Sequence, residues 1–202
     1  NQQGQLVAIN TPQGQIHSLS YTDGLLTSVS DSRGRSLHLQ YDLENRLTGL
    51  GLPDGKVVQY SYDTLGNLTK VTYPDDDVDP LNNPSTGYIY DDVNHPLVLT
   101  GKVDAKGNRV ASWVYDTEGR VIESKHINNN EATFFSYLGS KVIVTKNNGY
   151  EKTLDYVNGR LMTVTGDTCA SDGTKGVVTN TYNPYGYVSQ KLDAKGNKSV
   201  YS

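Results

Sequence analysis

The chain has 202 residues, 35% of them hydrophobic, and a formal net charge of −4. Its lysines and arginines are scattered singly, which excludes the basic patch of a nucleic-acid-binding or membrane-surface protein. It holds no run of about 18 apolar residues, so we predict no membrane span. Fifteen tyrosines stand against two phenylalanines and one tryptophan. This excess favours strands that carry an aromatic residue at a fixed position.

A short motif that starts with tyrosine recurs along the whole chain. Its eight copies start at Tyr21 (YTDGLL), Tyr41 (YDLENRL), Tyr62 (YDTLGNL), Tyr90 (YDDVNHPL), Tyr115 (YDTEGRV), Tyr137 (YLGSKV), Tyr156 (YVNGRL) and Tyr182 (YNPYGYV). The intervals between them are 20, 21, 28, 25, 22, 19 and 26 residues. A unit of about 20 residues, stretched by insertions, indicates a repeat architecture.

Each unit is predicted to contain two chain reversals. In YDxxGNL the aspartate suits the first position of a type I turn, and the glycine suits the left-handed position of a bulged hairpin. Asn45 replaces this glycine in one copy, because Asn tolerates positive φ. The second reversal is LPDGK, with Pro53 and Gly55. The same midpoint recurs at Gly34, Gly107, Gly149 and Gly196.

The residues between the turns alternate between apolar and polar. In RSLHLQY, for example, the two leucines and the tyrosine point to one side and the histidine and glutamine to the other. The strands LTSV, LTGL, LTKV and LMTV instead place apolar residues three apart, which a regular β-bulge or a partly covered outer face would each explain. We predict an all-β protein, an antiparallel β-hairpin array whose sheet twists and spirals.

We expect residues 1–202 to form one such array, cut from a longer chain. NQQGQLVAIN resembles the middle of a unit and lacks the features of a signal peptide, while LDAKGNKSVYS already starts another unit. Residues 74–87 are rich in Pro, Asp and Asn, and residues 166–176 consist of small turn formers. Both stretches are predicted to be surface loops.

Three groups of residues invite hypotheses about chemistry. Asp75, Asp76, Asp77 and Asp79 raise the idea of calcium, but their spacing does not fit a DxDxDG loop, and a solvated acidic loop is the simpler interpretation. The four histidines show neither HExxH nor a cysteine partner; they are His17, His38, His95 and His126. Cys169 has no second cysteine to pair with. We therefore predict no catalytic, cofactor-binding or metal-binding residue, and a structural role for the recurring Tyr-Asp pairs.

The series YDTLGNL, YDTEGRV and YDLENRL, with GLPDGK and DAKGNR at the half-unit, closely resembles the YD repeats of bacterial Rhs proteins. Those repeats are related to toxin-complex C components and animal teneurins. The resemblance covers essentially the whole chain and implies a sheet that spirals into a hollow β-shell. In bacterial members the shell encloses a toxic C-terminal segment of the same polypeptide. Self-cleavage in the family needs a separate terminal region, so we do not assign it to Asp79-Pro80.

Two functional hypotheses emerge. The first is a non-catalytic segment of a toxin-enclosing β-shell in a secreted or cell-surface Rhs-type effector, whose partners are the toxin domain and further repeats of the parent chain. The alternative is a carbohydrate-binding or adhesion module in which exposed tyrosines stack on sugars. We also expect edge-to-edge self-association of an excised fragment, because its outer strands lack neighbours. No enzymatic activity is expected.

Overall fold

The computed structural model describes residues 4–76, 83–126, 131–166 and 176–201. All 18 secondary-structure elements in these ranges are β-strands. The prediction of an all-β fold built from antiparallel hairpins is therefore confirmed. The chain divides into two compact units. The first comprises Asn1–Asp92 with Gly101–Arg109, and the second comprises Val93–Thr100 with Val110–Ser202.

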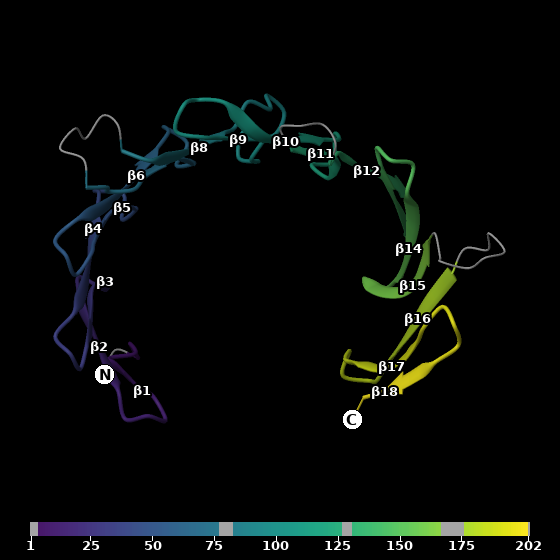
Figure 1. Cartoon of the computed structure of the whole chain (residues 1–202), viewed down its shortest axis with the longest axis horizontal. Coiled ribbons are helices and arrows are strands. Elements are labelled where there is room, and N and C mark those ends of the chain that lie inside the picture. The colour runs from purple at the N-terminus through teal and green to yellow at the C-terminus, as the bar shows by residue number, and fades with distance from the viewer. Residues whose placement is uncertain (1–3, 77–82, 127–130, 167–175, 202) are drawn as a thin grey trace. The chain divides into compact units, whose positions relative to one another are not determined.

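The first unit is an antiparallel meander in which each strand pairs with the next one along the chain (Figure 1). Its strands are β1 (Ala8–Asn10), β2 (Ile16–Thr22), β3 (Leu25–Asp31), β4 (Ser36–Tyr41), β5 (Leu47–Gly51), β6 (Val57–Tyr62), β7 (Leu68–Thr72), β8 (Ser85–Ile89) and β9 (Gly101–Val103). Because neighbours in sequence are neighbours in the sheet, the meander needs no crossover connection.

The second unit repeats the same plan, again with each strand paired to its successor. Its strands are β10 (Arg109–Tyr115, of which Arg109 belongs to the first unit), β11 (Val121–His126), β12 (Thr133–Leu138), β13 (Lys141–Lys146), β14 (Glu151–Val157), β15 (Arg160–Gly166), β16 (Gly176–Tyr182), β17 (Val188–Leu192) and β18 (Lys198–Val200). Successive pairs form hairpins, as two reversals in each repeat require.

The tyrosines share a face with the aliphatic residues, as the alternation predicts. In the first unit Tyr62 lies opposite Leu68 and Tyr60 lies opposite Val71. Residues directly opposite each other point to the same side of a sheet, so all four belong to one face. In the second unit this face is more mixed, because Lys191 lies opposite Asn180 on it.

Burial is thin throughout. Among the described residues the buried apolar side chains are Val58, Val71, Ala111, Ala132 and Val144, and none of the large side chains is fully enclosed. A single sheet layer covers its apolar residues only with neighbours in the same sheet, so it gains less from burial than a two-layer domain does. Hydrogen bonds between neighbouring strands and turns therefore carry a larger share of the stability.

The bounds of the two predicted loops differ from those in the structure. The loop expected at 74–87 ends earlier, because β8 begins at Ser85. Residues 77–82 and 167–175 lie outside the described residues, and with them Asp77, Asp79, Cys169 and most of the second predicted loop. Gly166 and Gly176, the ends of that loop, belong to β15 and β16.

The copy at Tyr90 does not form the expected turn. Its tyrosine follows β8, and the next strand starts only at Gly101. Pro96 restricts the backbone of His95 and occupies the second position of a different turn, in which the amide of Val98 donates to the carbonyl of His95 (3.1 Å). The proline thus explains why this copy of the motif forms a different turn.

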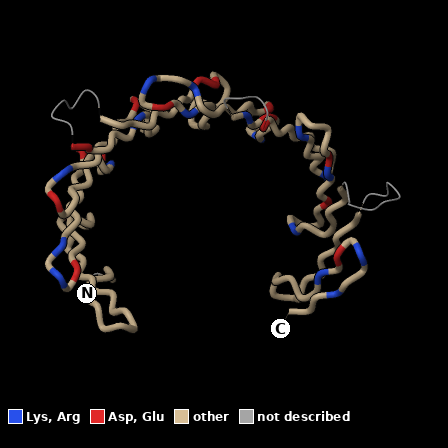
Figure 2. The backbone as a smooth tube through the Cα atoms, viewed as in Figure 1, with Lys and Arg blue, Asp and Glu red and all other residues tan. Residues whose placement is uncertain are grey.

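Charged residues of both signs occur along both units (Figure 2). Many of them are paired within a single turn, such as Arg35 with Asp31 and Arg120 with Asp116. No helix among the described residues has the length and apolar character needed to cross a membrane.

Candidate functional site: the repeated turn and tyrosine clamp

The YD turn is a five-residue loop held by its aspartate. In the turn that starts at Asp42, Oδ1 of this aspartate accepts hydrogen bonds from the amides of Glu44 (3.0 Å) and Arg46 (2.8 Å). The amide of Asp42 donates to the carbonyl of Arg46, and the amide of Asn45 donates back to the carbonyl of Asp42. Asn45 has φ of 61°, the left-handed position that a bulged hairpin requires. The predicted turn type is confirmed.

This loop occurs at both kinds of reversal, the YD turn and the half-unit turn. The same pair of backbone hydrogen bonds closes loops that start at Thr11, Asp31, Asp42, Leu52, Asp63, Asp104, Asp116, Lys146, Asn183 and Asp193. At the fourth position, nine of these loops have glycine with positive φ. The half-unit turns predicted at Gly34, Gly55, Gly107, Gly149 and Gly196 are all among them.

The fifth residue of the loop explains why the motif alternates between GR and GN. In the Asp42 turn, Nε of Arg46 donates to Oδ2 of the aspartate at 2.7 Å. In the Asp63 turn, Nδ2 of Asn67 donates to the equivalent oxygen at 2.9 Å. Both residue types therefore complete the coordination of the carboxylate. The side chain of Asn67, together with amides of the turn, lowers the pKa of Asp63, so this carboxylate is ionised at neutral pH.

Three tyrosine motifs replace the five-residue loop with a two-residue turn. In YTDGLL and YVNGRL both central residues have positive φ, with values of 50° and 85° at Asp23 and Gly24, and 50° and 75° at Asn158 and Gly159. This is the type I′ geometry that Asp-Gly and Asn-Gly pairs favour. In YLGSKV only Gly139 has positive φ, as a type II′ turn requires. These motifs differ from the others because they encode a shorter turn.

A β-bulge follows the turn in most units and explains why the strand after the turn has apolar residues three apart. Tyr62 pairs with Leu68 and Ser61 pairs with Lys70, which leaves Thr69 as the extra residue. The bulge turns Leu68 and Val71 to the same face although they are three apart. Equivalent register shifts occur at Tyr21, Tyr41, Tyr115, Tyr156 and Tyr182. The regular bulge is therefore the correct explanation for LTSV, LTGL, LTKV and LMTV.

The extra residue of the bulge is often a hydroxyl residue with a fixed partner. The hydroxyl of Thr69 donates to the carbonyl of Ser61 at 3.1 Å, and that of Thr48 to the carbonyl of Gln40 at 3.3 Å. Thr27 and Ser189 make the same contact with the carbonyls of Ser20 and Thr181. A bulge disrupts the ladder locally, and this hydroxyl restores a donor for the carbonyl that precedes the tyrosine.

In six of the eight copies of the motif, the tyrosine ties its unit to the preceding one. The hydroxyl of Tyr62 donates to the carbonyl of Leu47, the first residue after the previous turn, at 2.8 Å. The regular β5–β6 pairing ends at Gly49 and Gln59, so the hydroxyl closes the gap where the two strands diverge. We call this contact the tyrosine clamp. It recurs from Tyr21 to Leu6, Tyr41 to Leu26, Tyr115 to Leu99, Tyr137 to Val121 and Tyr182 to Leu161, at 2.7–2.9 Å.

An arginine of the turn lies over the ring of the next clamp. The guanidinium carbon of Arg46 lies 5.0 Å from the ring centroid of Tyr62, and that of Arg120 lies 4.3 Å from the ring centroid of Tyr137. These distances fit a cation–π contact. Because Arg46 also binds Asp42, one side chain links a turn to the tyrosine of the following unit. Burial is the main cause that raises the pKa of Tyr62, so its hydroxyl stays protonated and can donate.

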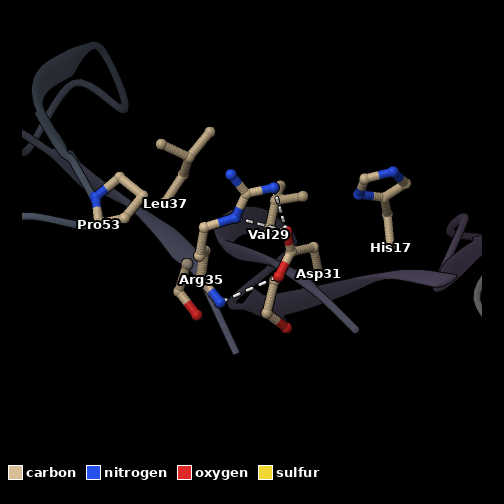
Figure 3. Close-up of a pocket in the computed structure, with 8 residues that line it drawn as sticks. His17, Val29, Asp31, Arg35, Leu37 and Pro53 are labelled. Atoms are coloured by element: carbon tan, nitrogen blue, oxygen red, sulfur yellow. Dashed lines mark hydrogen bonds and ion pairs between the residues drawn. The ribbon is translucent and has the colours of Figure 1, made fainter. Parts of the chain in front are cut away.

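A pocket of about 250 Å³ lies in the first unit, beside the half-unit turn at Asp31. Val29, Leu37 and Pro53 contribute apolar groups to it, and His17 lies on the far side of Asp31 (Figure 3). Three donors already occupy the carboxylate of Asp31: the amides of Arg33 and Arg35, and Nε of Arg35 at 2.8 Å. The side chain of Arg35 is the largest cause that lowers the pKa of Asp31. The carboxylate therefore serves the turn and is poorly suited to proton transfer.

The residues singled out as candidate ligands do not form a cluster. His17, His38 and His126 lie in β2, β4 and β11, and His95 lies between β8 and β9. Within residues 4–76, 83–126, 131–166 and 176–201, no three His, Cys, Asp or Glu side chains gather to hold a metal ion. Asp76 forms an ion pair with Lys56, and the hydrogen bond from the Lys56 ammonium, together with its charge, lowers the pKa of Asp76. The geometry of the described residues thus supports turns and clamps, and the lack of a calcium site stays a prediction.

Comparison with known proteins identifies the repeats. The family model described as RHS Repeat matches residues 21–55 and 41–78. The search of curated proteins gives no match.

Among solved structures, the Photorhabdus luminescens Tc holotoxin pore with a mutated TccC3 is 14% identical, with a TM-score of 0.38, over 96% of this chain and 14% of that one. A TcdB2-TccC3-Cdc42 crystal structure is 13% identical, with a TM-score of 0.38, over 97% of this chain and 15% of that one. TcdB2-TccC3 without its hypervariable C-terminal region is 12% identical, with a TM-score of 0.39, over 97% and 15%. The chain thus spans about 15% of the length of these chains.

The segment that the family model matches contains three clamp tyrosines, Tyr21, Tyr41 and Tyr62. The same clamp recurs in the second unit at Tyr115, Tyr137 and Tyr182. Residues 21–78 thus carry RHS repeats, in which the tyrosine and the aspartate of the YD motif are the clamp and the turn.

Proposed function

We propose that this chain is a non-catalytic wall segment of a YD-repeat β-shell that encloses a C-terminal toxin domain in a bacterial Rhs-type secreted effector. The observation that carries the proposal is that the recurring side chains make their contacts within the sheet itself. The carboxylate of Asp42 binds its own turn, Arg46 reaches the next ring, and Tyr62 binds the previous unit. Each repeated polar group therefore stabilises the sheet, which suits a wall. In this proposal residues 1–202 are one array within a longer chain, and no residue is catalytic.

The partners in this proposal are the enclosed toxin domain and the further repeats of the parent chain. The test uses the full parent polypeptide, since enclosure concerns the segment downstream of the repeats. Limited proteolysis should spare that segment in the wild type, and should digest it in a variant with Tyr62→Phe and Tyr137→Phe, because both clamps are lost. Equal digestion of the segment in the wild type and after denaturation would contradict the proposal.

A specific observation favours carbohydrate binding as the second candidate function. Tyr185 and Tyr187, in the turn that starts at Asn183, are 85% and 72% exposed, unlike the clamp tyrosines. Exposed aromatic faces stack on sugar rings. A glycan array read with the wild type and with Tyr185→Ala and Tyr187→Ala variants tests this function. Binding that both substitutions abolish, while a Tyr41→Phe variant retains it, would favour adhesion over enclosure.

Self-association of the isolated fragment through its sheet edges also stays a prediction. Size-exclusion chromatography over a concentration series checks it. Elution as a monomer at every concentration would count against it.

A further inference from the structure

We propose that the exposed two-residue turn at Asn158–Gly159 is a site of spontaneous succinimide formation, and that the second Asn-Gly pair of the chain, Asn148–Gly149, is protected by its turn. Asn-Gly is a thermolabile pair, because glycine has no side chain to hinder attack by its own main-chain nitrogen. Both pairs are exposed and share the same dipeptide. They differ in the turn that holds them.

In the five-residue loop both reacting groups are engaged. The amide of Gly149 donates to the carbonyl of Lys146 at 2.9 Å. The Oδ1 atom of Asn148 accepts a hydrogen bond from the amide of Tyr150 at 3.1 Å. The nitrogen of Gly149 can reach Cγ of Asn148 only after these two hydrogen bonds break, so the loop opposes the reaction.

In the two-residue turn neither restraint is present. Among the described residues, the amide of Gly159 donates no hydrogen bond and the side chain of Asn158 makes none. Pairing of Val157 with Arg160 closes the turn on either side of the dipeptide. The dipeptide can therefore rotate toward the reactive geometry while the flanking strands stay paired.

The chemistry needs only water. The main-chain nitrogen of Gly159 attacks Cγ of Asn158, a bond forms between them, and the Cγ–Nδ2 bond breaks. The proton of the main-chain amide leaves with Nδ2 as ammonia. Water then opens one of the two carbonyl carbons of the ring, which gives aspartate or isoaspartate at this position.

Two of the three Asp-Gly pairs of the chain provide a second, independent comparison, and the third, Asp172–Gly173, lies outside the described residues. Asp23–Gly24 lies in a two-residue turn, and the amide of Gly24 makes no hydrogen bond among the described residues. In Asp54–Gly55 the amide of Gly55 donates to the carbonyl of Leu52 at 3.0 Å, and Oδ1 of Asp54 accepts from the amide of Lys56. The same rule predicts that isoaspartate accumulates in the first pair and not in the second.

The product at Asn158 is expected to loosen one tyrosine clamp. Isoaspartate lengthens the main chain by one carbon, which a two-residue turn cannot absorb without shifting the strand that follows. Leu161, three residues on, supplies the carbonyl that Tyr182 binds at 2.8 Å. Hydrogen exchange in β16 should therefore rise as the modification accumulates.

The experiment ages the whole chain in mildly alkaline buffer and follows each pair by peptide mapping and mass spectrometry. The reaction at Asn148 must first break two hydrogen bonds that the turn at Asn158 lacks. Asn158 should therefore convert about tenfold faster than Asn148. In heavy-oxygen water, Asp23 should incorporate label about tenfold faster than Asp54 by the same reasoning.

A parallel sample unfolded in urea is the matched control, in which the members of each pair should react at similar rates. Equal rates in the folded chain would overturn the proposal. A rate ratio that persists in urea would also overturn it, because neighbouring residues and not the turns would then set the difference.

Discussion

Removal of a single hydroxyl from a tyrosine clamp tests whether the clamp stabilises the sheet. Tyr62→Phe deletes the 2.8 Å hydrogen bond to the carbonyl of Leu47 and leaves the ring under Arg46 in place. A hydrogen bond of this kind contributes about 0.5–1.5 kcal/mol net, and more where the abandoned carbonyl loses access to water. The Leu47 contact is partly buried, so we expect a loss of about 1 kcal/mol.

The matched control is Tyr60→Phe. Tyr60 lies in the same strand and on the same face, and its hydroxyl has no hydrogen-bond partner among the described residues. Repeat proteins unfold with imperfect cooperativity, so the assay combines urea denaturation with hydrogen exchange of individual amides. Tyr62→Phe should increase exchange in β5 and β6 near their diverging ends, and Tyr60→Phe should not.

The clamp also predicts a response to alkaline pH. Burial raises the pKa of Tyr62 above the ordinary value of 10.0, because the neutral hydroxyl is the form that the fold favours. The stability from the clamp is therefore complete below the unfolded pKa and is lost as pH rises through the higher folded pKa. Tyr62→Phe should flatten this part of the curve. If both phenylalanine variants unfold and exchange alike, the clamp has no energetic role and the reasoning is refuted.

Four further outcomes check the turns, the bulge and the acidic loop. Gly66→Val should lower the free energy of unfolding in urea by about 1 kcal/mol or more, because φ is +87° there and a β-branched residue resists this conformation. The space around Gly66 is open, so the backbone conformation and not a steric clash would cause the loss, and a smaller loss would contradict the turn assignment. The lowered pKa of Asp63 predicts stability that is present above the ordinary value of 3.8 and is lost as pH falls through the folded pKa; a pH titration of unfolding should show this, and Asp63→Asn should remove it. Thr48→Val should cost roughly 0.5–1 kcal/mol, because the hydroxyl that binds Gln40 is lost; an unchanged denaturation midpoint would show that the bulge does not need this donor. Asp76→Asn should change the midpoint little, and calorimetry should detect no calcium binding to either form; binding lost in the variant would revive the calcium hypothesis.

The turns were predictable because their chemistry is local. An aspartate followed three residues later by Gly or Asn specifies the loop with backbone rules alone, and Asn45, with φ of 61°, follows that rule. The adjacent Asp-Gly and Asn-Gly pairs at residues 23–24 and 158–159 also carried a signal, since such pairs favour two-residue turns. These copies resemble the ones with five-residue loops so closely that the shorter turn was not predicted.

The contacts between units were not predictable in the same way. Whether Leu68 and Val71 share a face depends on how their strand pairs with β6. A bulged and a regular pairing are both compatible with the sequence. The clamp depends on where Tyr62 lies relative to Leu47, which is a matter of packing between hairpins. Its only trace in the sequence is the preference for tyrosine over phenylalanine, since a strand face alone would accept either residue.

The clamps also have a direction along the chain. In each of the six, the donor lies later in the sequence than the acceptor, as from Tyr62 back to Leu47. During synthesis the acceptor leaves the ribosome before the donor. Every clamp can therefore form as soon as its tyrosine emerges, before the later repeats are synthesised. Growth by one hairpin at a time from the N-terminal side would keep few strands exposed during synthesis, which suits a polypeptide whose sheet is long and only one layer thick.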